Sequence, residues 1–189
     1  GVGIVGTGTQ ARMQLELLKG IVDCNRCVIW GRNPDKVAQM IDDLGSRDSI
    51  AAWGLEFEAA ESIDVLTASC NLIVTTTPAR EPLLHADQIR AGTHITAMGS
   101  DDHGKQELEA TLLGKADLVV ADSISQCVDH GECCHAVRDA VIREADILEL
   151  GDVISDPERG RGDDQQITIA DLTGIAIQDI QAAKMACKG

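Results

Sequence analysis

Short apolar runs alternate with amphipathic stretches along the 189 residues of the chain. Most of these runs contain several β-branched side chains, which is typical of strands that are covered on both faces. The pattern predicts strands over residues 2–5, 26–30, 51–57, 72–78, 93–98, 117–121 and 167–171.

The stretches between the runs repeat their apolar residues with the period of a helix that buries one face. In residues 62–69, for example, Val65 and Leu66 are expected to face the core. Strands that alternate with helices predict an α/β fold, here a doubly wound, mainly parallel sheet with helices on both faces. The helices are predicted over residues 10–19, 34–44, 62–69, 83–90, 123–129, 134–142 and 173–184, with a helical turn over residues 149–154 and a loop over residues 155–166.

The first predicted strand leads directly into Gly6-Thr-Gly-Thr-Gln-Ala11 and the first predicted helix. A strand, a G-x-G-x-x-A turn and a helix together form the fingerprint of a Rossmann-like dinucleotide-binding domain. Gly6 permits the tight turn, Gly8 lets the backbone approach a pyrophosphate, and Ala11 lets the helix pack closely on the strand. Similar glycine turns occur in folds without a cofactor, but this context favours a bound nicotinamide dinucleotide.

The composition agrees with a single α/β domain over residues 1–189 and excludes several classes of partner. Hydrophobic residues make up 44% of the chain, with one Phe, no Tyr and two Trp, so the core should be aliphatic. The net charge of −15 argues against nucleic acid, which requires a basic surface. No apolar run approaches the length of a membrane span and no signal peptide begins the chain, so we expect a cytoplasmic protein that binds no membrane.

The chain begins at Gly1, inside the first predicted strand, without an initiator Met. We therefore expect it to be the dinucleotide-binding part of a longer protein, with any substrate-binding part encoded upstream.

The end of the second predicted strand is where a nicotinamide enzyme usually selects its cofactor. An acidic residue there binds the ribose of NAD, whereas an Arg accommodates the 2′-phosphate of NADP. The chain has Gly31 in the acidic position, Arg32 directly after it and Lys36 one turn further on. This pattern favours NADP over NAD. The alternative is that Arg32 is an exposed turn residue before a helix that begins at Pro34.

A group of polar residues follows the predicted strand over residues 93–98. Asp101, Asp102, His103 and Lys105 lie within five positions, where a catalytic acid or base could reach a nicotinamide. The alternative is a solvated loop in which Asp101 or Asp102 caps a helix.

The cysteines do not predict a metal site. The seven cysteines in a chain without a secretion signal should be free thiols, and Cys24-x-x-Cys27 has no second pair at zinc-finger spacing. A denser group could bind a metal, but its side chains would diverge on a helix, so we expect none; it comprises His130, Glu132, Cys133, Cys134 and His135.

Several stretches together resemble the ornithine cyclodeaminase and mu-crystallin family. They occur in order along almost the whole chain: Gly6-Thr-Gly-Thr-Gln-Ala11, Trp30-Gly-Arg32, Thr75-Thr-Thr-Pro-Ala-Arg-Glu-Pro82, Met98-Gly-Ser-Asp-Asp-His-Gly-Lys-Gln-Glu-Leu108, Gly131-Glu132 with His135, Leu150-Gly-Asp-Val153 and Ile169-Ala-Asp-Leu-Thr-Gly-Ile-Ala-Ile-Gln-Asp179.

The resemblance implies a role in cofactor binding for particular positions. Thr9 and Gln10 would lie on the pyrophosphate, and the adenosine ribose would be surrounded by Gly31, Arg32 and Asn33. The remaining positions would line the dinucleotide cleft or flank the nicotinamide: Thr75, Thr76, Thr77, Met98, Gly99, Ser100, Lys105, Leu172 and Thr173. Asp101 matches the acid/base Asp of the family, while His103 stands where many members have Pro.

The resemblance also implies the chemistry. Family members use NAD or NADP and include amino-acid cyclodeaminases, alanine dehydrogenases and reductases of ketimines or pyrroline-2-carboxylate. They act on the α-carbon of an amino acid or a cyclic imine. Their substrate-binding Lys and Arg residues and their homodimer interface belong to an N-terminal domain that this chain lacks. The cofactor half does not separate lyase from reductase.

Two other functions stay open at this point. The first is a non-catalytic, NADP-dependent small-ligand binding protein of mu-crystallin type, which would have no need of Asp101 beside the nicotinamide. The second is an unrelated NADP-dependent dehydrogenase, which Asp101-x-x-Gly-Lys105 and Asp171-Leu-Thr-Gly174 disfavour.

Overall fold

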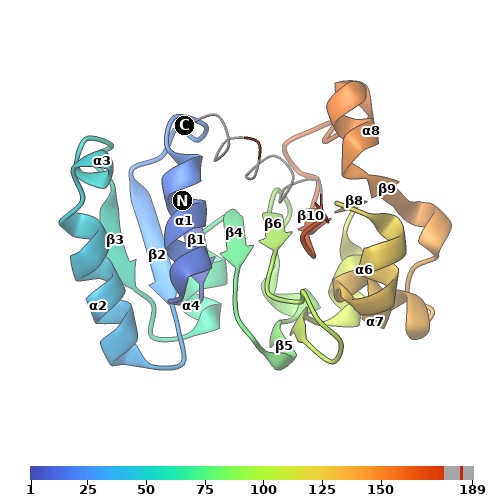
Figure 1. Cartoon of the computed structure of the whole chain (residues 1–189), viewed down its shortest axis with the longest axis horizontal. Helices are drawn as coiled ribbons and strands as arrows, with labels where there is room; N and C mark the ends of the chain where they lie inside the picture. Colours follow the sequence, from blue (N-terminus) through green and yellow to red (C-terminus); the bar gives the residue numbers. More distant parts are fainter. Residues whose placement is uncertain (177–183, 185–189) are drawn as a thin grey trace.

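The computed structural model describes residues 1–176 and residue 184. In this part of the chain, one eight-stranded parallel sheet runs through the molecule in the order β3-β2-β1-β4-β6-β10-β8-β9 (Figure 1). Its strands are β1 (Val2–Val5), β2 (Arg26–Trp30), β3 (Glu56–Ala59), β4 (Leu72–Thr75), β6 (His94–Ala97), β8 (Leu118–Ala121), β9 (Ile147–Glu149) and β10 (Thr168–Asp171).

Eight α-helices and three 3-10 turns are assigned within residues 1–176. The α-helices are α1 (Thr9–Leu18), α2 (Pro34–Gly45), α3 (Asp48–Ala51), α4 (Ile63–Ser69), α5 (Ala110–Lys115), α6 (Ile124–His130), α7 (Glu132–Arg138) and α8 (Leu150–Ser155). The 3-10 turns are η1 (Ala86–Gln88), η2 (Glu144–Asp146) and η3 (Pro157–Arg159).

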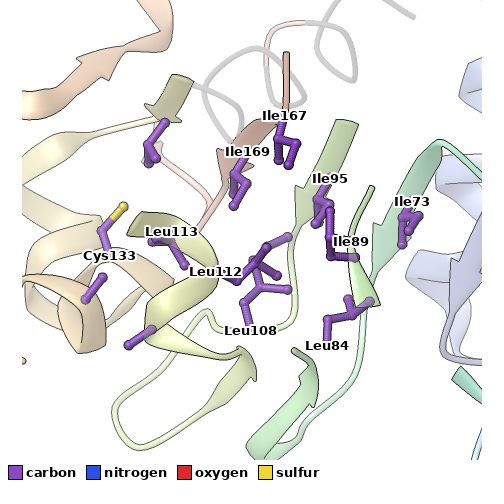
Figure 2. Packing of buried hydrophobic residues seen from close by; sticks show 14 of the residues in the cluster. Ile73, Leu84, Ile89, Ile95, Leu108, Leu112, Leu113, Cys133, Ile167 and Ile169 are labelled. Carbon is purple, nitrogen blue, oxygen red and sulfur yellow. The ribbon is translucent and has the colours of Figure 1, made fainter. Parts of the chain in front are cut away.

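The alternation of side chains along the strands divides the core between the two faces of the sheet. Ile4 and Ile29 pack with residues of α1 and α2, whereas Val5 and Val28 belong to a larger cluster with α4 and the C-terminal half. Aliphatic side chains dominate this larger cluster, as the composition predicts. Figure 2 labels Ile73, Leu84, Ile89, Ile95, Leu108, Leu112, Leu113, Cys133, Ile167 and Ile169 in it.

Two short strands form a second, two-stranded parallel sheet. These are β5 (Arg80–Leu84), which follows β4, and β7 (Gln106–Leu108), which follows β6. The pair therefore connects the chain segments that leave two neighbouring strands of the main sheet (Figure 1).

Three predictions of local structure were wrong. The predicted helix over residues 83–90 is the end of β5 followed by η1, and the predicted strand over residues 51–57 begins only at Glu56, after α3. Val65 is 38% exposed because α4 turns Leu66, and not its neighbour, toward the sheet. Leu83, Ala86 and Ile89 all contact the core and recur every three residues, a spacing that a short helix would also produce, so the apolar pattern alone could not exclude a helix.

The other predicted elements are confirmed within a few residues at each end. Most of the predicted final helix over residues 173–184 lies outside the described residues. None of the helices in the described part of the chain has the length and apolar character that crossing a membrane requires.

Candidate cofactor site and catalytic loop

Four segments that were predicted to bind a cofactor meet at one edge of the sheet. Backbone hydrogen bonds extend the ladder past the strand ends, from Thr76 N to Val5 O (2.9 Å), from Met98 N to Thr75 O (3.0 Å) and from Leu172 N to Ala97 O (2.9 Å). The chain changes direction across the sheet between β1 and β4. In an open α/β sheet, such a switch point at the carboxyl ends of the strands is where ligands bind.

The glycine turn between β1 and α1 leaves the start of the helix open. Gly6 has φ +124°, and its N–H donates to Trp30 O at 2.8 Å. A Cβ at Gly6 would lie 2.6 Å from Thr76 Oγ1, whereas a Cβ at Gly8 would meet no atom within 4 Å. Gly6 is therefore required by the fold itself, while Gly8 faces free space at the first turn of α1.

A cleft of about 260 Å³ opens at this edge. Seven of the predicted cofactor residues line it, namely Gly6, Gly8, Gly31, Arg32, Asn33, Thr76 and Thr77. The cleft also takes in side chains that the sequence did not single out for binding, namely Thr7, Trp30, Pro78 and Leu83, together with Lys36. Thr7 lies within the fingerprint, and Trp30 and Pro78 are each next to a predicted residue, whereas Leu83 reaches the cleft only through the unpredicted β5.

The other predicted cofactor residues lie around the cleft and do not line it. Thr9 and Gln10 are exposed on the first turn of α1, and Ala11 is buried beneath it. Thr173 is buried, and its hydroxyl donates to Asp122 Oδ1 at 3.2 Å. Thr75, Gly99 and Ser100 are buried, while Met98, Lys105 and Leu172 are half-buried.

The loop after β6 presents Asp101 to solvent. The Asp101 side chain is 53% exposed and forms an ion pair with Lys105. Ser100 Oγ donates to Lys105 O at 2.9 Å, and His135 Nε2 lies 2.8 Å from the same oxygen, so both ends of the loop are fixed. Neither Asp101 nor Asp102 caps a helix, because the chain continues into β7, so the alternative of a helix cap is wrong.

The sequence model of the "Ornithine cyclodeaminase/mu-crystallin family" matches residues 1–188. The chain belongs to this family. The iminosuccinate reductase of Paracoccus denitrificans is 36% identical over 97% of this chain and 54% of its own length. The alanine dehydrogenase of Archaeoglobus fulgidus is 37% identical, with the same two coverages. The chain thus spans about half the length of the curated relatives it matches.

Solved structures of family members have the same fold. The crystal structure of the Paracoccus denitrificans iminosuccinate reductase in complex with NAD+ has a TM-score of 0.86 and covers 97% of this chain and 54% of the reductase. The Thermococcus litoralis Δ1-pyrroline-2-carboxylate reductase in complex with NADH and L-proline has a TM-score of 0.88 at 28% identity, covering 98% of this chain and 56% of that protein. The predicted Rossmann-like fold is confirmed by these structures and by the strand order.

This family member buries three carboxylates that no periodicity in the sequence indicates. They are Glu107, Glu132 and Asp171, each at most 1% exposed. Glu132 accepts hydrogen bonds from the backbone N–H groups of Glu107 (2.7 Å) and Leu108 (3.0 Å), and Asp171 accepts one from Cys133 N (2.9 Å). Burial raises the pKa of all three carboxyl groups above their ordinary values, and the hydrogen bonds oppose this shift.

Glu132 should make the stability of the chain depend on pH. Because the pKa of Glu132 is raised in the folded state, the folded chain holds this proton at pH values where the unfolded chain has lost it. The contribution of Glu132 to the free energy of unfolding is fully present at pH values below its unfolded pKa of about 4.3, and it is lost as the pH rises toward the folded pKa. Relative to a Glu132→Gln variant, the parent should therefore lose up to about 1.4 kcal/mol of unfolding free energy per pH unit as the pH rises from the unfolded toward the folded pKa of Glu132.

Urea unfolding of both proteins over a series of pH values above about 4.3 measures the difference, in which titrating groups that do not interact with Glu132 cancel. A difference that stays constant, or that grows in favour of the parent as pH rises, would contradict the burial of an ionisable Glu132.

The predicted Cys-His group does not assemble into a metal site. Cys133 is buried, and burial raises the pKa of its thiol. The fold instead brings donor atoms of His103, Asp129 and His130 within 4.8 Å of one another, but the first two side chains are 72% and 64% exposed. We assign no ion to this surface group. The six described cysteines form no disulfide with one another, in agreement with the prediction of free thiols; they are Cys24, Cys27, Cys70, Cys127, Cys133 and Cys134.

Proposed function

We propose that residues 1–189 are the dinucleotide-binding domain of an NAD(P)-dependent enzyme that acts at the α-carbon of an amino acid through an imine. The observation that carries the proposal is the combination of two features at one sheet edge: the cleft beside Gly8 and the exposed Asp101–Lys105 pair on the loop after β6. In this proposal the substrate-binding and dimerisation domain of the family precedes the residues described here, and the full-length protein is a homodimer.

The residues of the cleft fit a dinucleotide. The open space beside Gly8 leaves room for a pyrophosphate against the first amides of α1, and the dipole of that helix favours the negative charge. Gly31, Arg32 and Asn33 would surround the adenosine ribose at the end of β2. When bound, the nicotinamide would accept or deliver the hydride.

Asp101 would carry the proton that must accompany the hydride. When a hydride adds to the carbon of a C=N bond, the nitrogen must gain a proton for an amine to form, and the reverse reaction releases that proton. Asp101 presents its carboxyl group at the strand end where the nicotinamide is expected. Lys105 contacts this group and restricts its orientation.

Of the two kinds of reaction, we propose that this protein catalyses the reductase or dehydrogenase reaction and not the cyclodeaminase reaction. The support is two relatives at 36% and 37% identity, an iminosuccinate reductase and an alanine dehydrogenase. A relative at 39% identity is called an uncharacterized cyclodeaminase, so an assay must decide between the reactions. An assay of the full-length protein separates the reactions. A reductase oxidises one NAD(P)H for each imine consumed, whereas a cyclodeaminase releases ammonia from a diamino acid without net change in the cofactor. Ammonia release without net cofactor turnover would overturn this assignment.

Arg32 should favour NADP over NAD. Arg32 and Lys36 both line the cleft at the end of β2, and Gly31 leaves this position without a carboxylate. We expect this chain to bind NADPH more tightly than NADH. Arg32→Ala should reduce the difference in binding free energy between the two cofactors by about 1–3 kcal/mol, the value of a charge-assisted contact to phosphate. Fluorescence titration of both cofactors measures this difference.

The control is Arg143→Ala, which removes an exposed Arg far from the cleft and should leave this difference unchanged. Equal affinity of the parent chain for both cofactors would contradict the proposal. Gly31→Asp, which would add an acceptor for the ribose and so favour NADH, is a less informative test. A Cβ at Gly31 would lie 2.8 Å from Thr7 Cγ2 in the wall of the cleft.

A further inference from the structure

Glu107 connects the segment that was predicted to line the dinucleotide cleft with the segment that was predicted to lie beside the nicotinamide. Its carboxylate accepts hydrogen bonds from Thr75 Oγ1 at 2.6 Å, from Thr77 N at 2.5 Å and from Gly99 N at 2.8 Å. Thr75 and Thr77 are at the end of β4, and Gly99 is at the end of β6. One buried side chain thus fixes the ends of two neighbouring strands relative to each other.

The position of Glu107 is itself fixed from the other side. Glu107 lies on β7, whose backbone N–H groups at Glu107 and Leu108 donate to the carboxylate of Glu132 on α7. The carboxylate of Glu107 therefore cannot follow the two segments if they separate. Thr77 lines the cleft, and Gly99 is two residues before Asp101, so a shift at either contact would be transmitted to the proposed site.

Only a carboxylate can satisfy this arrangement. Its two oxygens accept all three donors, and it brings no donor of its own when ionised. An amide of the same shape has one oxygen and one NH2 group, so at least one of the backbone N–H groups of Thr77 and Gly99 would face another donor.

We infer that Glu107 is a positioning residue of the cofactor site, whose carboxylate sets the spacing between the Thr75–Thr77 segment and the Gly99–Asp101 segment. This inference rests on the proposed function. The competing explanation is that Glu107 only holds the fold together. Asp117 provides the comparison, because its carboxylate also accepts a backbone N–H, that of Ile167 at 2.8 Å, but at the opposite end of the sheet.

The test compares E107Q and D117N in this chain. Urea unfolding gives the stability of each variant, and NADH titration without denaturant, at a temperature where both variants are folded, gives the dissociation constant. We expect E107Q to weaken NADH binding by about tenfold, the equivalent of one hydrogen bond in a charged site, and D117N to change it less than twofold. In the full-length enzyme, kcat should fall for E107Q beyond any loss of folded protein, and should not do so for D117N.

A second pair of variants covers the case in which E107Q does not fold. Thr75→Val removes one donor to Glu107 and keeps the shape of the β4 side chain. Thr168→Val removes a similarly buried hydroxyl, which contacts His94 Nδ1 at 2.7 Å at the opposite end of the sheet. We expect Thr75→Val to weaken NADH binding two- to fivefold and Thr168→Val to leave it unchanged.

The outcomes separate the inference from the proposed function. Equal effects on the NADH dissociation constant in both members of a pair, or no effect in either, would show that Glu107 is structural only and would overturn the inference. If the parent chain bound neither NADH nor NADPH, the proposed function would fail first, and the inference with it.

Discussion

Asp101→Asn in the full-length enzyme should lower kcat by a factor on the order of 10²–10⁴, the usual contribution of a positioned acid or base. The amide has the shape of the carboxyl group but cannot exchange a proton with the imine nitrogen or a water. The affinity for the cofactor and the fold should be unchanged. Steady-state turnover, measured beside an NADH or NADPH titration of the same variant, tests both parts.

The environment of Asp101 explains why its loss should cost little stability. Its side chain is 53% exposed, and its ion pair with Lys105 is at the surface, where such pairs contribute about 0–1 kcal/mol. The matched control is Asp102→Asn. Asp102 is also exposed, but its carboxylate accepts the backbone N–H of His103 at 2.8 Å, so we expect Asp102 to stabilise the loop. Asp102→Asn should therefore lower kcat far less than Asp101→Asn does.

Three results would contradict this role for Asp101. Turnover of Asp101→Asn near the parent rate would remove the acid/base assignment, and the non-catalytic binding protein of mu-crystallin type would become the better explanation. Loss of cofactor binding with normal folding would instead place Asp101 in the cofactor site. Lower stability alone would indicate a structural role.

The parts of the fold that sequence predicted correctly depend on local patterns. Residues 2–11 contain a strand, a glycine turn and the start of a helix within a single stretch, and the structure forms all three. The same holds for Ser62, which was predicted to begin a helix and caps α4 by accepting the N–H of Val65 at 3.3 Å. In each case, the residues that decide the conformation are neighbours in the chain.

The parts that were missed depend on distant contacts. β5 and β7 each have few residues, and they form a sheet only because β4 and β6 bring residues 80 and 106 side by side. Glu107 resembles any other polar residue in a charged loop. It becomes an internal carboxylate through partners that are 30 and 32 positions away, Thr77 and Thr75. No periodicity within residues 99–108 could have revealed this.

The candidate site shows the same division. The family motifs identified the segments around the cleft, but only seven of the predicted cofactor residues line it. Among the others, Ala11, Thr75 and Thr173 are buried. A motif records which residues recur, and it does not distinguish a side chain that touches the ligand from one that supports the backbone beside it. Thr173, whose hydroxyl donates to Asp122, is an example of the second kind.

Gly99→Ala should lower the free energy of unfolding of this chain by an amount on the order of 3–5 kcal/mol, near the upper end for single substitutions. A Cβ at Gly99 would lie 2.2 Å from Thr77 O and 2.5 Å from Glu107 Oε2. The first is a backbone atom just after β4, and the second belongs to a carboxylate that accepts three hydrogen bonds. Neither neighbour can move without breaking hydrogen bonds, so the strain of overpacking adds to the loss of those bonds.

Gly8→Ala is the control, because a Cβ at Gly8 would meet no atom within 4 Å. It should change the free energy of unfolding by less than about 1 kcal/mol, the usual effect of Ala at a helix N-cap. It should nevertheless weaken NADH binding by about tenfold or more, because the new methyl group would occupy the space assigned to the pyrophosphate. Urea unfolding and NADH titration of the parent and both variants test the two glycines together. If Gly99→Ala were as stable as the parent, the ends of β4 and β6 could not be as close as Glu107 holds them, and the arrangement on which the proposed cofactor site depends would be wrong.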